Sequence, residues 1–133
     1  MESNSQLAPV SKAGLWTGWI ITGLVGLFLL FDAIVKLIMV NEVIEASVRL
    51  GYHENTMFGI GLVLLISTLL YLIPKSAVLG AILLTAYLGG AVTTHVRVGD
   101  PFYFPIVMGF LVWIGIYLRE KRLKLMVPVR REI

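Results

Sequence analysis

The chain has 133 residues, of which 58% are hydrophobic and only 14% are charged, a balance outside the usual range of water-soluble domains of this size. It contains no cysteine, which excludes disulfides, thiolate catalysis and thiolate metal sites. The formal net charge of +3 comes mainly from basic residues after the last apolar segment, so a nucleic-acid partner is not expected. The composition instead predicts a protein whose main partner is the lipid bilayer.

Four apolar segments follow one another along the chain, at residues 15–40, 56–73, 77–93 and 103–118. Each is long enough to cross about 30 Å of hydrocarbon, the shorter ones with little tilt. The connections between them are short, which favours antiparallel neighbours in an up-and-down arrangement. We therefore predict an all-α fold, a membrane-spanning four-helix bundle in which residues 1–133 form a single transmembrane domain.

The three connections differ in character. Residues 41–55 carry apolar positions at helical spacing and predict a short amphipathic helix at the membrane interface, ended by Gly51. The second connection, Pro74-Lys75-Ser76, is a tight turn in which Ser76 is expected to cap the next helix. Residues 95–102 are predicted to form a loop on the same side as the interfacial helix, because both follow odd-numbered spans.

The basic residues predict the orientation of the bundle. Two of them, Arg49 and Arg97, lie on the side of the interfacial helix. Eight lie on the side of the two termini, namely Lys12, Lys75, Arg119, Lys121, Arg122, Lys124, Arg130 and Arg131. Because basic connections stay on the cytoplasmic side, we predict a multi-pass protein of the cell (inner) membrane with both termini, and the basic tail 119–133, in the cytoplasm.

Asp32 and Lys36 stand one helical turn apart in the first span. A charge at the centre of a bilayer costs about 2.5 to 3.5 kcal/mol, so such residues usually face a protein interior and have a partner. Acid first and base four residues later also suits an ion pair within one helix. The pair continues a ridge of small residues that is expected to face another helix, formed by Gly14, Gly18, Thr22 and Gly26.

A second interior face is predicted on the third span, where Gly80, Tyr87 and Thr94 repeat at intervals of seven and Gly90 lies beside them. By the predicted topology, this face and the ridge of the first span meet at their outer ends. The candidate site is therefore a polar cluster at the outer end of the bundle, made of Asp32, Lys36, Tyr87, Thr94, His95, Arg97 and Asp100.

Three interpretations of this cluster are open. In the structural one, Asp32 pairs with Lys36 or Arg97, and the network only holds the bundle together. In the binding one, the cluster holds a quinone- or lipid-like molecule, whose carbonyl or head group accepts hydrogen bonds from His95, Arg97 or Lys36. In the catalytic one, Asp32 or His95 serves as acid or base on a lipophilic substrate, so the sequence leaves open whether the protein is an enzyme.

Other site types have less support. The two histidines, His53 and His95, lack a metal-ligand spacing, so no metal site is expected. A transporter is disfavoured because the spans carry no midplane charges and no helix breaks. The glycine ridge of the first span suits contact with a second copy of the chain as well as contact within the bundle, which leaves a homo-oligomer open.

Two features of the sequence are specific beyond its apolar runs: the Asp32/Lys36 spacing and the motif His95-Val96-Arg97, which follows Tyr-Leu-Gly-Gly-Ala at residues 87–91. In these features the sequence resembles the DoxX-like family of small four-helix membrane proteins. The resemblance covers roughly residues 18–119. It implies the four-helix membrane fold and a role as subunit or partner in membrane redox or thiol-stress systems, because the family takes its name from a subunit of a thiosulfate:quinone oxidoreductase.

The chain departs from the family pattern in two respects. Many relatives carry an acid within the second span, where this chain has Leu64, which argues against a mechanism that needs a second buried carboxylate. Relatives linked to thiol chemistry imply a redox role, but a chain without cysteine cannot relay thiols itself. Two hypotheses therefore remain: a non-catalytic binding module or redox-complex subunit that holds a quinone- or lipid-like molecule near the polar cluster, and a membrane enzyme that acts on a lipophilic substrate.

Overall fold

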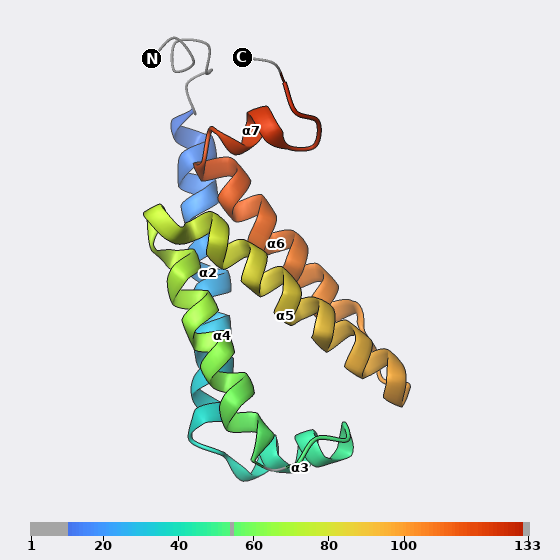
Figure 1. Ribbon diagram of the computed structural model, residues 1–133. Coiled ribbons are helices and arrows are strands. Elements are labelled where there is room, and N and C mark those ends of the chain that lie inside the picture. Colours follow the sequence, from blue (N-terminus) through green and yellow to red (C-terminus); the bar gives the residue numbers. More distant parts are fainter. Residues whose placement is uncertain (1–10, 54, 132–133) are drawn as a thin grey trace.

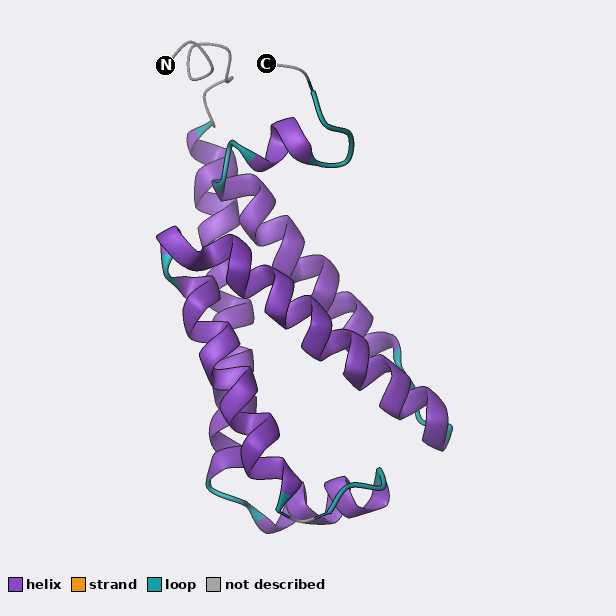
Figure 2. Cartoon of the chain, viewed as in Figure 1, coloured by secondary structure: helices purple, strands orange, loops and turns teal. Residues whose placement is uncertain are grey.

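The computed structural model describes residues 11–53 and 55–131, so the predicted domain limits at 1 and 133 lie outside the described residues. This part of the chain forms α-helices and one 3-10 turn, with no strand among the described residues (Figure 2). The all-α prediction is confirmed. The elements are α2 (Lys12–Leu37), α3 (Asn41–Arg49), α4 (Thr56–Leu72), a 3-10 turn (Pro74–Ser76), α5 (Ala77–Val98), α6 (Tyr103–Arg119) and α7 (Leu123–Met126).

The four long helices run alternately up and down, and α2 packs against both α4 and α6. Helix α5 packs against the same two neighbours from the other side, so α2 and α5 are diagonal to one another. Helix α3 lies across one end of the molecule, and the first and last described residues lie at the other end (Figure 1). Toward α3, the pair α2/α4 diverges from the pair α5/α6.

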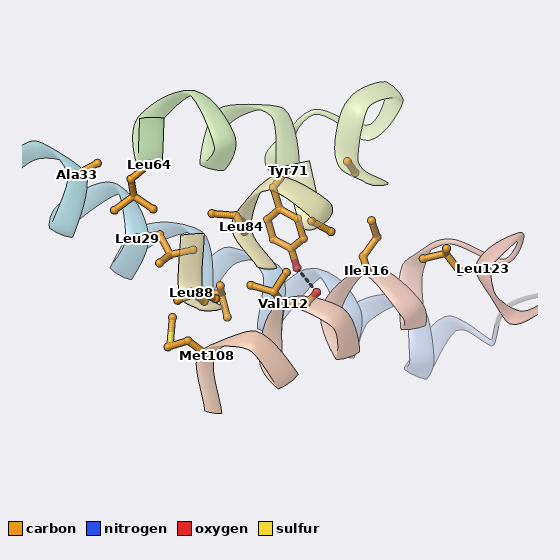
Figure 3. Close-up of a cluster of buried hydrophobic side chains, with 13 residues drawn as sticks. Leu29, Ala33, Leu64, Tyr71, Leu84, Leu88, Met108, Val112, Ile116 and Leu123 are labelled. Atoms are coloured by element: carbon orange, nitrogen blue, oxygen red, sulfur yellow. Dashed lines mark hydrogen bonds between the residues drawn. The ribbon is translucent and has the colours of Figure 1, made fainter. Parts of the chain in front are cut away.

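The helices converge at the end away from α3, around a buried aromatic ring. Tyr71 is fully buried, and its hydroxyl donates a hydrogen bond of 2.7 Å to the carbonyl of Val112 on α6 (Figure 3). Leu84 of α5 and Ile116 of α6 are fully buried in the same cluster. Tyr71 of α4 therefore connects α5 and α6 with the pair α2/α4.

Glycines permit the closest approaches between helices. A Cβ at Gly80 would overlap the backbone of Tyr71, so α5 can fold back over α4 only with glycine there. On α2, a Cβ at Gly18 would lie 2.9 Å from the Cβ of Leu118, and one at Gly26 would lie 2.7 Å from Leu72. The prediction that this ridge faces other helices is confirmed at Gly18 and Gly26. These ridge positions are occupied within the chain and are not free to contact a second copy.

Helices α3 and α5 end in the same way. Each helix is followed by a glycine with positive φ, Gly51 two residues after α3 at +93° and Gly99 directly after α5 at +78°. The amide of this glycine and the amide of the next residue bond back to the last turn, as in a Schellman motif. The prediction that Gly51 ends the interfacial helix is confirmed. The predicted loop 95–102 is wrong in its first half, because α5 continues to Val98 and Gly99 is the first residue that reverses the chain without strain.

The predicted cap at Ser76 is also wrong. Ser76 has φ −112° and ψ 9°, which is not the extended conformation of an N-cap, and its side chain does not cap α5. Its hydroxyl instead donates a hydrogen bond of 2.9 Å to the carbonyl of Leu70. The cause is the 3-10 turn Pro74–Ser76, which leads directly into α5 and leaves no extended residue between the two helices.

Large apolar side chains cover the outside of the four long helices. Leu27, Ile66, Leu79 and Phe110, one from each helix, are between 50% and 69% exposed. Two helical stretches, Lys12–Leu37 and Pro74–Val98, are long and apolar enough to cross a membrane. The other two long helices are apolar but have 17 residues each, which corresponds to about 26 Å at 1.5 Å per residue.

Gly80→Ala tests the closest helix contact. The added methyl group would push α5 away from the backbone of Tyr71, and we expect a loss of about 2 to 3 kcal/mol in the free energy of unfolding. The matched control is Gly89→Ala on the same helix, where a Cβ would have no neighbour within 4 Å and should stabilise the helix by about 0.5 to 1 kcal/mol. Denaturant titration in detergent micelles, followed by circular dichroism, measures both. Equal effects of the two substitutions would refute the close approach at Gly80.

Candidate functional site

A cavity of about 870 Å³ lies where the two helix pairs diverge. Its volume is within the range of about 300–1,000 Å³ that is usual for small-molecule sites. All four long helices and the segment between α2 and α4 contribute to its wall. Five of the predicted site residues line it, namely Asp32, Lys36, Tyr87, Thr94 and His95.

The lining changes from apolar to polar along the helices. On α2, the lining residue nearer the buried core is Leu29, whereas Lys36 lies nearer α3. On α5, Leu88 lies nearer the core and Thr94 lies nearer the end of the helix. The cavity is therefore amphipathic, with its hydrogen-bonding groups toward α3.

The ion pair forms within α2. The ammonium of Lys36 donates a hydrogen bond of 2.5 Å to Asp32, and the two side chains are 15% and 30% exposed. Lys36 pairs with Asp32 in preference to any partner from the loop side. A Cβ at Gly61 would lie 2.8 Å from the Cβ of Lys36, so glycine on α4 provides the space in which the lysine packs.

The prediction that the faces of the first and third spans meet at their outer ends is wrong. Helices α2 and α5 have no extensive contact there, because the helix pairs diverge and the cavity separates the faces. Gly90 is exposed, with no atom within 4 Å of the position of a Cβ. The link across the cavity is the ammonium of Lys36, which lies 5.9 Å from the centroid of the Tyr87 ring, within cation–π range.

His95 faces the cavity with one ring nitrogen already bonded. Its Nδ1 lies 2.7 Å from the carbonyl oxygen of Ala91. A carbonyl only accepts, so Nδ1 carries the proton, and Nε2 of the neutral ring is an acceptor. His95 can therefore accept a hydrogen bond from a hydroxyl group of a bound molecule.

Tyr52 joins the end of the α3 segment to α5. Its hydroxyl lies 2.8 Å from the hydroxyl of Thr94. Because Thr94 donates its proton to the carbonyl of Gly90 at 2.9 Å, Tyr52 is the donor in the first bond. We call residues 41–52 the capping segment, since they cover the end of the cavity and are held there by this bond.

Arg97 and Asp100 do not line the cavity. Arg97 donates a hydrogen bond of 2.9 Å to the carbonyl of Leu50, and Asp100 forms an ion pair of 2.6 Å with Arg49. Both contacts attach the capping segment to the end of α5. A Cβ at Gly51 would lie 3.0 Å from Arg97, so this turn favours glycine both for its positive φ and for the space. The seven predicted site residues thus divide into five at the cavity and two that hold its cover.

A protein-family model matches the part of the chain that contains the cavity. The model of the DoxX-like family matches residues 20–115. The chain belongs to the DoxX-like family. The match includes every residue of the polar cluster, and membership suggests a membrane protein. Neither the curated proteins nor the solved structures include a significant match to the chain.

A second polar site of this DoxX-like protein lies at the convergent end of the helices. Arg119 donates hydrogen bonds to the hydroxyl of Thr22 at 3.1 Å and to the carbonyl of Tyr71 at 2.8 Å. Its guanidinium also lies 4.6 Å from the centroid of the Trp19 ring. The sequence predicted Arg119 only as a topology signal. The fully buried Thr22, the one hydroxyl on the glycine ridge, is the signal that could have indicated a polar partner.

Lys36→Met tests how much the ion pair contributes to stability. The substitution leaves the carboxylate of Asp32 partly buried without its partner, and we expect a loss of about 1 to 3 kcal/mol in the free energy of unfolding. The double variant Asp32→Leu/Lys36→Met removes both charges and should recover most of this loss. Denaturant titration of both variants provides the comparison. A double variant as unstable as Lys36→Met would show that the lysine stabilises the fold through other contacts.

Arg119→Met tests the second polar site. Two partners, the hydroxyl of Thr22 and the carbonyl of Tyr71, lose their donor, so we expect a loss of about 2 to 3 kcal/mol. Arg122→Met is the control, because Arg122 is exposed and its removal should change stability by less than about 0.5 kcal/mol. The midpoints of thermal unfolding in detergent distinguish the two. Similar midpoints for the two variants would show that Arg119 does not stabilise the fold and would leave it only as a basic residue that sets the orientation.

Proposed function

We propose that this DoxX-like protein is a multi-pass membrane protein that binds a quinone- or lipid-like molecule in the cavity without transforming it. The observation that carries the proposal is the amphipathic cavity of about 870 Å³, apolar toward the core and lined by hydrogen-bonding groups toward α3. A lipophilic molecule with a polar head matches this division of its wall. As a binding subunit, the protein would present such a molecule to a membrane redox partner.

The membrane part of the proposal has three supports. Family membership suggests it, and two helices have the length and apolar composition of membrane spans. The third support is the outer surface, where soluble proteins rarely expose so many large apolar side chains side by side. We propose that α2, α4, α5 and α6 all cross the bilayer as a four-helix bundle, with α3 at the outer interface.

The proposed orientation places the convergent end in the cytoplasm and the cavity near the outer side of the inner membrane. The first and last described residues lie together at the convergent end (Figure 1). Most basic residues lie on the same side, including Arg119 and Arg122. Basic segments stay in the cytoplasm, which supports this orientation.

Binding has more support than catalysis. Asp32 already accepts a hydrogen bond from Lys36, so its carboxylate is engaged in an ion pair. His95 uses Nδ1 within its own helix, which leaves one nitrogen for a ligand. Lys36 and the Nε2 of His95 can bond to the carbonyl or hydroxyl groups of a head group. Acid or base catalysis by Asp32 or His95 on a lipophilic substrate stays a prediction that rests on Nε2 of His95, because the carboxylate of Asp32 is engaged in its ion pair.

Mass spectrometry of the protein in its own lipid tests the proposal. Extraction in polymer-bounded native discs avoids detergent, and organic extracts of the discs are compared with the bulk membrane. We expect one class of hydrophobic molecule to be enriched with the wild-type chain and lost from Asp32→Leu/Lys36→Met, which lacks the polar head contacts. The control is Lys75→Met, an exposed residue away from the cavity. No enrichment with the wild-type chain, or equal enrichment with the double variant, would refute the proposal.

A further inference from the structure

Building on the proposed function, we infer that the cavity takes a neutral lipophile with a hydrogen-bonding head group, and that this molecule enters sideways from the bilayer between α4 and α5. The charges of the lining determine the class of ligand. The route follows from which sides of the cavity are closed by direct contacts and which side is open.

The cavity lining carries no unpaired permanent charge among the described residues. Its acidic and basic side chains are Asp32 and Lys36, which neutralise one another at 2.5 Å. Arg97 and Asp100 lie outside the lining and are bonded to the capping segment. A phosphate or carboxylate head would therefore lose its hydration without meeting a free cation, which is unfavourable. A neutral hydroxyl or carbonyl loses far less and still finds a partner.

Partners for a neutral head are present. Lys36 has three ammonium protons, and within the described residues it uses one in the bond to Asp32. Nε2 of His95 accepts a hydrogen bond when the ring is neutral, because Nδ1 donates to the carbonyl of Ala91. The head group can thus accept from Lys36 and donate to His95. A molecule with both a hydroxyl and a carbonyl group, or with two hydroxyl groups, fits this pair.

Two sides of the cavity are closed by direct contacts. On the α2/α6 side, the rings of Phe28 and Phe104 both line the cavity and meet edge to face, with centroids 5.1 Å apart. At the end, the capping segment is fastened to α5, with Tyr52 bonded to Thr94 and Arg97 bonded to the carbonyl of Leu50. Neither side offers an open path.

The α4/α5 side is built differently. Gly59 and Val63 lie one turn apart on α4, and Ala86 and Gly90 lie one turn apart on α5. All four line the cavity, and all four are exposed. No atom lies within 4 Å of the position of a Cβ at Gly59 or at Gly90. Helices α4 and α5 diverge here (Figure 1). With glycine and alanine at three of the four positions, this side is open, and in the proposed membrane arrangement the opening lies at the depth of the acyl chains.

A cysteine reporter tests the route, because the natural chain has no cysteine to give background. Met108→Cys places a thiol on α6 in the cavity wall, where the residue is 5% exposed. Met57→Cys on α4 is a second reporter, 4% exposed, should the first fail to fold. In proteoliposomes each labelling rate is divided by the rate of the same reagent with free cysteine. On this scale N-(1-pyrenyl)maleimide, which dissolves in the bilayer, should label the thiol at least about tenfold faster than a cationic methanethiosulfonate reagent.

Gly90→Trp places a large side chain in the opening between α4 and α5. The control is Gly89→Trp, because Gly89 is also exposed but does not line the cavity. We expect Gly90→Trp to slow labelling by pyrenylmaleimide about tenfold and Gly89→Trp to leave the rate nearly unchanged. Circular dichroism confirms that each variant keeps its helical content. Equal rates in the two variants, or faster labelling by the cationic reagent, would overturn lateral access.

The class of ligand is tested by protection of the same thiol. Monooleoylglycerol and oleate share one acyl chain and differ in head charge. We expect monooleoylglycerol to slow labelling several-fold at concentrations where oleate does not, and protection by oleate alone, or by neither lipid, would overturn the neutral class. These rates do not depend on the molecule that the cell supplies. Failure here is therefore separate from failure to find an enriched molecule in native discs.

Discussion

The contact of α5 and α6 with Tyr71 is the constraint on which the shape of the molecule depends. Gly80 lets the backbone of α5 pass directly over Tyr71, and Gly115 lets α6 approach its hydroxyl, where a Cβ would lie 2.8 Å away. Straight helices that touch so closely at one end separate at the other, unless equally small residues continue along the interface. Further along α5 the side chains that face the core are the larger Leu84 and Leu88, whereas the small residues Ala86 and Gly90 are exposed. Divergence, and with it the cavity, follows from the packing at the opposite end.

The cover of the cavity depends on helix termination. Helices α3 and α5 are both followed by a glycine in the left-handed region, and the residues at the two turns bond to one another. The carbonyl of Leu50, exposed by the turn at Gly51, is the acceptor for Arg97 in the last turn of α5. Two local chain reversals thus create a contact between segments 47 residues apart. A helix-ending glycine thus helps to hold the cover of the cavity in place without lining the cavity itself.

Local features of the fold could be predicted from the sequence, and long-range ones could not. The apolar segments, the Asp32–Lys36 pair and the turn at Gly51 depend on residues within a few positions of one another, and the structure contains a helix at each segment, the ion pair and the turn. The divergence of the helix pairs depends on Gly80 meeting Tyr71, and no spacing rule indicates which glycine makes the closest contact. The same holds for Arg119, whose partner Thr22 lies 97 residues away.

The two polar sites show why position, more than residue type, separates a binding site from a structural contact. Arg119 lies between the rings of Trp19 and Tyr71, at 4.6 and 5.1 Å from their centroids, and its hydrogen bonds satisfy buried groups on two other helices. Lys36 has an acidic partner on its own helix and borders an open cavity. The first cation is surrounded by protein that would be destabilised without it. The second is neutralised but not enclosed, so it keeps a polar surface in an apolar environment without the cost of a free charge. In the proposed membrane arrangement, that combination would let the cavity bind a polar head group and exclude ions.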